Sequence, residues 1–339
     1  MFQIALRLLL LDITKVWEGE AQTIQKRGHR LDVDHVALTP GFLMGKSGKT
    51  LKSLSVNRIT SKHCPIRRDL YMEVVMRREG KGTWGRIVGP LIEAYCKGLF
   101  NAFGDLYKSG AGLSYRDLED RVESYTDTFK QERQATFDAL EKLAQETGVE
   151  DDPTVLLLRL KYTAKSELAM LAADRSLRQS SAQDTQSLLE QVPIEYTGDV
   201  LSITPSKYLG IGSAATPDLI ITNPPIVGDV KSGSSLERKH LYTCVGYALA
   251  YESQHKIDVN YGVIYFFETH TQTTLNSAQC YVIFLSDRLR EEFLNERDDA
   301  YRVLQAPSPL PPLTGDLQKR YCTYCKYREE CDKDRGPAQ

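Results

Sequence analysis

The spacing of apolar residues changes along this chain, and the changes mark out its elements. Residues 64–102 carry apolar positions three and four apart, which predicts helices. Residues 112–190 continue this spacing without a strand signal, and a turn at 148–153 divides them, so we expect a helical hairpin or small helical subdomain. From residue 192 onward, β-branched and aromatic strands alternate with helices. The expected strands are 218–222, 226–231, 260–267 and 280–285, and the expected helices are 237–254 and 287–304.

This alternation predicts an α/β fold that carries an additional helical region. The same changes divide the chain into five parts. They are an N-terminal extension (1–60), entry helices with one cysteine and a basic patch (61–111), a helical subdomain (112–191), an α/β core (192–306) and a cysteine-rich tail (307–339).

The composition is that of an ordinary globular protein, with 41% hydrophobic and 26% charged residues among 339 and a net charge of -2. This balance excludes a chain that holds nucleic acid by bulk charge, so any contact with DNA must come from a local basic cluster. One such cluster lies between Arg58 and Arg86, where eight basic residues outnumber three acidic ones. The chain has no run of 18 apolar residues, and Arg7 interrupts the short apolar stretch 4–11. We therefore expect no membrane segment, no secretory signal and a cytoplasmic location.

Candidate chemistry lies on the first two expected strands of the α/β core. A turn at 223–225 joins them, and antiparallel pairing brings Asp218, at the start of one strand, and Asp229, near the end of the other, to the same edge of the sheet. Lys231 follows Asp229 by two residues and so lies on the same face of its strand. Two carboxylates, with the Val230 carbonyl as a third oxygen, suit Mg²⁺ or Mn²⁺, and an ammonium beside them can position the attacking water. The pattern predicts metal-assisted phosphodiester hydrolysis; the plainer interpretation is a solvated strand end.

The seven cysteines do not indicate a disulfide framework, because their number is odd and no export signal accompanies them. Three lie singly in apolar segments, where ordinary burial accounts for them: Cys96, Cys244 and Cys280. The other four are Cys64 and a C-x2-C-x5-C motif in the tail, formed by Cys322, Cys325 and Cys331. Four thiolates can hold an iron–sulfur cluster or a structural zinc, and the spacing alone slightly favours zinc. Either the cluster or the zinc would tie the entry helices to the tail. The remaining alternative is that the four are unrelated free cysteines.

Taken together, these motifs resemble the RecB-like branch of the PD-(D/E)XK superfamily. The resemblance rests on the strand pair with Asp218, Asp229 and Lys231, the glycine-bearing helix start at 84–86 and the helical segment 247–252. One cysteine before the core and three after it narrow the match. The chain is similar to the CRISPR-associated RecB-like exonucleases of the adaptation machinery, most closely to their type I-A archaeal branch. The similarity covers residues 58–102 and 192–331.

This resemblance implies a restriction-endonuclease-like PD-(D/E)XK core with a mixed central sheet over residues 192–306. It also implies an iron–sulfur cluster on the four cysteines, 4Fe-4S rather than 2Fe-2S. The implied activity is Mg²⁺- or Mn²⁺-dependent exonuclease cleavage of single-stranded DNA, which trims captured DNA ends before their integration as new spacers. The implied partners are single-stranded DNA or DNA ends and the CRISPR integrase subunits, and a homo-oligomer is compatible with them.

The sequence departs from the family pattern at two positions. Gly89 occupies the place of the histidine that normally completes the metal shell. Glu93 lies four residues later on the same helix face, which makes it a candidate ligand or, in the plainer interpretation, a solvated helix residue. Thr243 stands where the pattern usually has glutamine, and Tyr247 keeps the stacking or hydroxyl role toward DNA.

The basic cluster supplies three candidates for contact with the DNA backbone, for each of which a solvated surface position is the alternative: Arg67, Arg68 and Arg86. A second function also stays open, that of a non-catalytic subunit that recognises a DNA motif and leaves cutting to other proteins. Gly89 favours this alternative, whereas the intact Asp218, Asp229 and Lys231 disfavour it.

Overall fold

A computed structural model gives the conformation of most of the chain beyond its first 52 residues. The described segments are 53–80, 84–108, 115–147, 153–180, 194–195, 209–212, 215–222, 225–268, 278–323 and 325–335. Most of the expected N-terminal extension lies outside them. No helix in these segments has an apolar stretch that could cross a bilayer.

The centre of the protein is a five-stranded sheet in the order β1-β2-β3-β4-β5. Its strands are β1 (Ile194–Glu195), β2 (Leu219–Thr222), β3 (Pro225–Gly233), β4 (Tyr261–Glu268) and β5 (Gln279–Phe284). β3 and β4 run parallel, while the other neighbouring pairs are antiparallel, so the sheet is mixed. The four strands expected from β-branched and aromatic content are confirmed, and β1 adds a fifth.

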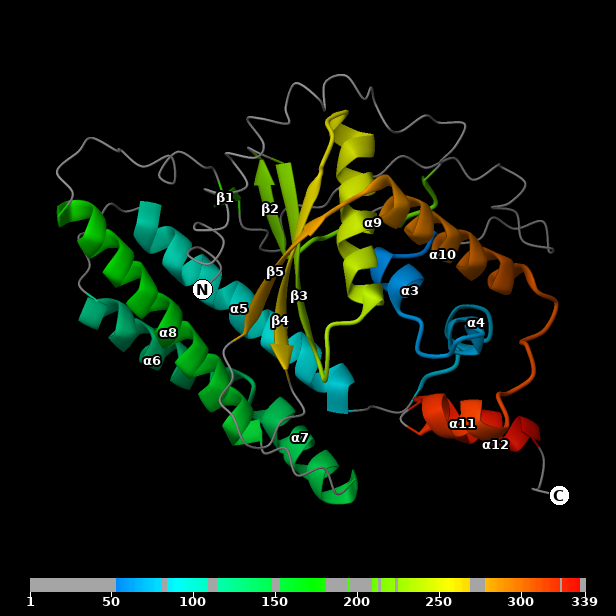
Figure 1. Ribbon diagram of the computed structural model, residues 1–339. Helices are drawn as coiled ribbons and strands as arrows, with labels where there is room; N and C mark the ends of the chain where they lie inside the picture. Colours follow the sequence, from blue (N-terminus) through cyan, green and yellow to red (C-terminus); the bar gives the residue numbers. More distant parts are fainter. Residues whose placement is uncertain are drawn as a thin grey trace.

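One long helix connects the parallel strands. α9 (Arg238–His255) follows β3 and leads back to the start of β4, which is the crossover that parallel neighbours require. It packs on one face of the sheet together with α10 (Asp287–Gln305) and α3 (Val56–Thr60), as Figure 1 shows. Leu54 and α3 are buried in this core, so residues 53–60 belong to the core rather than to an appended extension.

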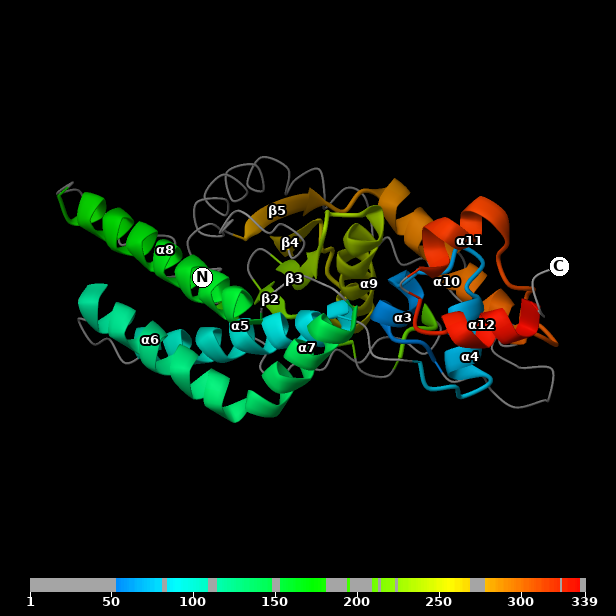
Figure 2. The same cartoon turned by 90° about the horizontal axis from the view of Figure 1, so that it is seen from below.

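The opposite face is covered by the helical region. α5 (Trp84–Lys108) lies against β3, and α6 (Tyr115–Glu132), α7 (Gln134–Thr147) and α8 (Pro153–Ser180) pack on its outer side (Figure 2). The helical character expected for 112–190 is confirmed over the described residues 115–147 and 153–180, but the first of these stretches is two helices rather than one. The chain leaves the first helix at Arg133 and begins the next at once, so apolar spacing runs through the break.

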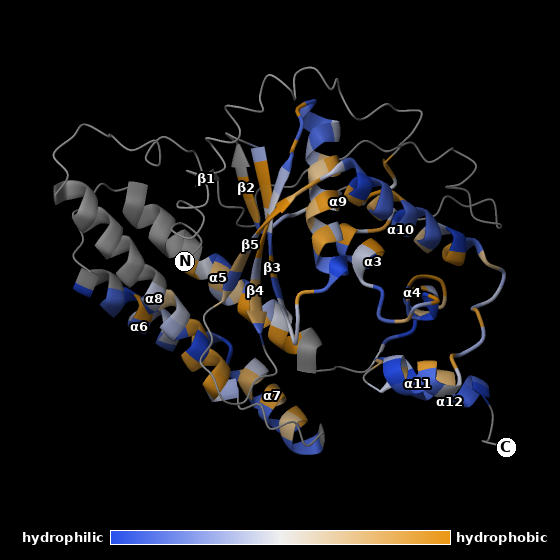
Figure 3. Ribbon diagram, in the orientation of Figure 1, coloured by the Kyte–Doolittle hydropathy of each residue, from blue (hydrophilic) through white to orange (hydrophobic). Residues whose placement is uncertain are grey.

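Side-chain alternation along the strands separates the two cores. Val227 of β3 and Ile264 of β4 contribute to the core on the α9 side, whereas Val230 and Tyr265 contribute to the core on the α5 side. The strands and much of α9 are accordingly hydrophobic, while α10 and the C-terminal helices show hydrophilic surfaces (Figure 3).

A small third unit lies at the end of the molecule away from α6 and α8. It consists of α4 (Arg68–Val74), α11 (Gly315–Cys322) and α12 (Arg328–Arg335), which gather below α10 in Figure 1. Its buried apolar cluster is small and contains Met72, Tyr327 and Cys331. The entry segment and the tail therefore meet in space, although more than 240 residues separate them in the sequence.

Candidate functional site

The pairing of β2 with β3 brings the two predicted aspartates together. The register places Leu219 opposite Gly228, and the backbone N–H of Asp218 donates to the Gly228 carbonyl at 3.0 Å. The backbone N–H of Val230 donates to Oδ2 of Asp218 at 2.8 Å. Asp218 and Asp229 are 5% and 2% exposed. The juxtaposition expected from antiparallel pairing is therefore present, while the role of these aspartates and of the Val230 carbonyl as metal ligands stays a prediction.

Three more charged side chains complete a cluster around the aspartates. Lys231 forms an ion pair with Oδ2 of Asp229, as their position on one strand face predicts. α5 contributes Glu93 and Lys97: the Nζ of Lys97 lies 2.5 Å from Oε1 of Glu93 and 2.9 Å from Oδ1 of Asp218. These three carboxylates and two ammoniums are called the carboxylate site below.

Lys97 is the member of this site that the sequence did not single out. The spacing of four residues from Glu93 was its only signal, since that spacing puts both side chains on one face of α5. Nothing in the sequence indicated that this face of the helix would turn toward Asp218. Its proximity to Asp218 follows from the packing of α5 on β3.

Burial and crowding set the electrostatics of the carboxylate site. Burial raises the pKa of Asp218 to about 6, and the charge of Asp229 adds to the rise against an opposing effect of Lys97. Burial also raises the pKa of Glu93, to which Asp218 contributes. For Lys97 and Lys231 burial acts to lower the pKa, but the adjacent carboxylates outweigh it and raise the pKa of both. Both lysines are therefore cations at neutral pH, and they hold together carboxyl groups that would otherwise repel one another.

Of two candidate residues on α9, Tyr247 lies near the carboxylate site and Thr243 contacts another helix instead. Tyr247 is buried, and its pKa is raised by burial and then by the charges of Asp229, Asp218 and Glu93. That environment favours a hydroxyl role beside the carboxylates over stacking on a base. Thr243 is also buried and shares a hydrogen bond of 3.3 Å with a threonine of α3, so it serves the packing of α9.

Gly89 leaves free space beside the carboxylate site. A β-carbon at this position would meet only Oγ of Ser232, at 3.4 Å, which is ordinary contact. Gly89 also lies one helical turn before Glu93. The expected histidine position thus faces the end of β3 and has room for a side chain.

Two predicted DNA contacts do not fit the structure. Arg67 is fully buried, and its guanidinium donates to Oε2 of Glu296 at 2.5 Å. Arg68 is 3% exposed and pairs with Asp334 of the tail. As folded, neither guanidinium is available to a DNA backbone, and we correct their role to that of internal ties between the entry segment and the C-terminal helices.

Much of the predicted basic patch is neutralised in the same way. Arg58 pairs with Glu73 at 3.0 Å, and Lys62 pairs with Glu296 at 3.1 Å. The side chain of Arg86, the third predicted DNA contact, lies outside the described residues. Part of the excess of basic residues counted along the sequence is therefore offset by distant acidic partners, Glu296 of α10 and Asp334 of α12.

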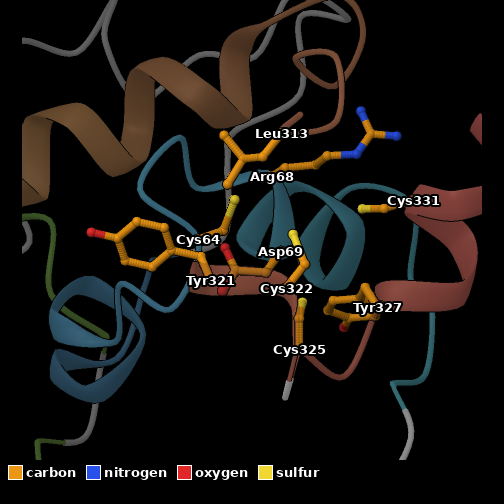
Figure 4. Close-up of a pocket in the computed structure, with 9 residues that line it drawn as sticks. All are labelled: Cys64, Arg68, Asp69, Leu313, Tyr321, Cys322, Cys325, Tyr327 and Cys331. Atoms are coloured by element: carbon orange, nitrogen blue, oxygen red, sulfur yellow. The ribbon is translucent and has the colours of Figure 1, made fainter. Parts of the chain in front are cut away.

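The four singled-out cysteines line one pocket. Figure 4 shows Cys64, from the loop before α4, gathered with Cys322, Cys325 and Cys331 from α11, α12 and the link between them. All four are free thiols. Asp69 shares the pocket wall, and its buried Oδ1 has no hydrogen-bond partner in the described residues. The four cysteines thus lie together as expected, while their role as ligands of a metal or cluster stays a prediction.

Backbone groups around these thiols are arranged to stabilise negative sulfur. Burial raises the pKa of Cys64, against N–H groups of Arg68 and Ile66 that lower it. Burial raises the pKa of Cys325 to about 11, against the N–H of Tyr327. N–H groups aimed at sulfur are what a metal-bound thiolate uses, so the surroundings suit a ligand that deprotonates the thiols.

Both regions fit the metal that the sequence implies for them, judged by their donor atoms. The carboxylate site offers hard oxygens, and Oδ2 of Asp229 is buried without a well-formed hydrogen bond in the described segments, although Lys231 lies beside it. The cysteine pocket offers four sulfurs, the donor set of an iron–sulfur cluster or of zinc. Across the described part of the chain, no three or more His, Cys, Asp or Glu side chains already stand in a metal-binding arrangement.

Comparison with known proteins points in the same direction. The profile of a family described as "CRISPR-associated exonuclease Csa1" matches residues 46–332. A curated protein of that description from Saccharolobus solfataricus is 33% identical over 87 residues, which make up 26% of this chain and 29% of that protein. The alignment thus spans less than a third of that relative's length.

Proposed function

Because the chain belongs to the CRISPR-associated exonuclease Csa1 family, we propose that it is a metal-dependent deoxyribonuclease that trims single-stranded DNA ends for spacer acquisition. The observation that carries this proposal is the carboxylate site. Asp218, Asp229 and Glu93 converge there with two ammoniums at the end of a paired strand. Acidic oxygens with an adjacent lysine are the groups that hydrolysis of a phosphodiester needs.

The roles follow from the surroundings of each side chain. Asp218 and Asp229 would hold Mg²⁺ or Mn²⁺, with the Val230 carbonyl and Glu93 as further oxygens. Such an ion, when bound, polarises the phosphoryl group and acidifies a water. Lys231 stays protonated because Asp229 lies beside it, so its ammonium can orient the attacking water and offset the charge that develops on the phosphate.

The wider proposal concerns the fold and the tail. We interpret residues 192–306 as a restriction-endonuclease-like PD-(D/E)XK core, and the cysteine pocket as the seat of a 4Fe-4S cluster, with zinc as the alternative. The division into five parts is kept as a proposal with its first boundary moved to about residue 53. The proposed partners are DNA ends and CRISPR integrase subunits, and self-association stays a compatible expectation.

Digestion of labelled single-stranded DNA tests the activity. We expect purified protein with Mn²⁺ to release nucleotides, EDTA to stop the release and added Mn²⁺ to restore it. Asp229→Asn and Lys231→Met should each lower the rate at least about 100-fold. Lys142→Met, which removes an exposed ion pair with Glu146, is the matched control and should leave the rate unchanged.

The result also decides between the two functions. If the wild-type protein binds DNA but releases no nucleotide with any divalent ion, the non-catalytic recognition subunit is the correct function, as Gly89 would favour. If Asp229→Asn or Lys231→Met keeps the wild-type rate while the protein stays folded, the roles assigned to the carboxylate site are wrong.

A further inference from the structure

Lys97 occupies the space between two carboxylates that a divalent ion would have to share. Its Nζ lies 2.9 Å from Oδ1 of Asp218 and 2.5 Å from Oε1 of Glu93. These distances are those of charge-assisted hydrogen bonds. The oxygens that face each other from the sheet and from α5 are thus already bridged by a cation that belongs to the protein.

The charge balance of the site explains why such a bridge forms. Three carboxylates crowd a buried strand end, and Lys231 pairs with only one of them, Asp229. Without Lys97, Asp218 would face the 40% exposed Glu93 without a counter-charge, which is costly for the buried Asp218. Lys97 supplies the missing charge.

Lys97 is also able to leave. Its side chain is 27% exposed, whereas Asp218 is 5% exposed and therefore fixed in place. A lysine ammonium is a point charge on a flexible stem, so it can turn to solvent while the buried Asp218 stays in place. A divalent ion at Asp218 and Glu93 would replace one positive charge by two.

We propose that Lys97 is an internal counter-ion that competes with the divalent ion for Asp218 and Glu93 and thereby sets the metal affinity of the site. This inference rests on the proposed function in so far as it takes these carboxylates as metal ligands. Lys97 acts through them and is a positioning residue, not a catalytic one.

Calorimetric titration of Mn²⁺ into the full-length protein tests the proposal. The Asp229→Asn variant measures the Mn²⁺ that binds outside the carboxylate site, and this amount is subtracted. Lys97→Met should bind Mn²⁺ about tenfold more tightly than the wild type, a change of the size seen when groups around metal ligands are altered. The metal-free Lys97→Met protein should melt at a lower temperature, and Mn²⁺ should raise its melting temperature by more than it does for the wild type.

Two further variants separate charge from packing. Lys97→Arg keeps the cation and should retain wild-type affinity, while Lys97→Gln removes the charge, keeps a donor and should behave like Lys97→Met. Lys165→Met is the matched control and should leave the affinity unchanged, because Lys165 of α8 pairs with Glu119 and Glu123 of α6, away from the site.

Equal or weaker Mn²⁺ binding by both Lys97→Met and Lys97→Gln would overturn the proposal. The outcome is distinct from that of the nuclease assay. If these variants bind Mn²⁺ more tightly but no protein cuts DNA, the counter-ion role holds and the proposed function fails. If the wild type cuts DNA but its affinity does not respond to Lys97, only the counter-ion role fails.

Discussion

The carboxylate site and the cysteine pocket differ in how each is held together without a metal. At the carboxylate site, Lys97 and Lys231 already neutralise most of the acidic charge, and two large cores on either face of the sheet support it. At the cysteine pocket, burial raises the pKa values of the Cys64, Cys325 and Cys331 thiols, and the buried apolar cluster behind them contains, among the described residues, Met72, Tyr327 and Cys331.

This difference indicates different uses of metal. Protein ammoniums can substitute for an ion in holding carboxylates together, so the first region is expected to keep its shape while an ion enters and leaves. The second region joins the entry segment to the tail through a few polar ties, such as Arg68 with Asp334 and Lys326 with Glu73. A bound metal would supply there the stability that a core of this size cannot.

The largest expected effect follows from removing one thiol of the pocket. Cys331→Ala should abolish metal binding by the pocket. Without the metal, α11 and α12 should detach from α4 and unfold. Structural zinc in small domains contributes roughly 10–16 kcal/mol of folding free energy, so the local loss should be on the order of several kcal/mol. Metal content by mass spectrometry and hydrogen exchange of residues 315–335 measure the two parts of the effect.

Cys280→Ala is the matched control, because this cysteine lies on β5, outside the pocket. It should keep full metal content and protection of the tail. Full metal content in Cys331→Ala would contradict the four-cysteine site, and unchanged protection after loss of the metal would contradict the bracing role.

An intermediate effect is expected from acid, through a histidine that lies between the two regions. The N–H of Glu237 donates to Nδ1 of His240 at 3.0 Å at the start of α9. Burial, followed by the charges of Lys239 and Lys231, lowers the pKa of His240 to about 4; His63 acts in the same direction, and Glu237 opposes them.

The unfolded chain therefore takes up this proton at a higher pH than the folded protein does. Stability should fall as pH decreases from about 6.5 toward 4, by up to about 3 kcal/mol if the whole shift is realised. Urea unfolding across this range should give a flatter pH dependence for His240→Gln than for the wild type. His255→Gln, at the other end of α9, should keep the wild-type slope; an equal slope in His240→Gln would refute the assignment.

The elements and the chemistry at the end of each strand were predictable from the sequence. β-branched residues located β2 to β5, and the period of two along a strand placed Lys231 beside Asp229. Cysteine spacing grouped Cys322, Cys325 and Cys331, and Cys64 joined them as the remaining cysteine that does not lie singly in an apolar segment. All of these follow from local patterns, which a single sequence contains.

Contacts between distant segments were not predictable in this way. Counting charges near Arg67 and Arg68 suggested a surface for DNA, but their partners Glu296 and Asp334 lie more than 220 residues away. Lys97 was overlooked for the same reason, since only the packing of α5 on β3 gives it a partner at Asp218. Ion pairs across a fold depend on tertiary structure, and local charge excess is a poor guide to an exposed patch.

The smallest effect concerns Gly89, where the carboxylate site lacks the expected histidine. Gly89 precedes Pro90 inside α5, and the ring of a proline crowds the β-carbon of the residue before it when that residue is helical. Glycine avoids this crowding, so Gly89→His should both add an imidazole and strain the helix.

Gly89→Ala carries the strain without the imidazole and is the proper reference. Apart from its own helix, the new β-carbon would meet Oγ of Ser232, at 3.4 Å, so the side chain has room to reach the carboxylates. In a calorimetric titration, Gly89→His should bind Mn²⁺ about tenfold more tightly than Gly89→Ala does. This corresponds to a difference of about 1.4 kcal/mol in binding free energy. Equal affinities would mean that the site has adapted to its lysines and has no place for an imidazole ligand.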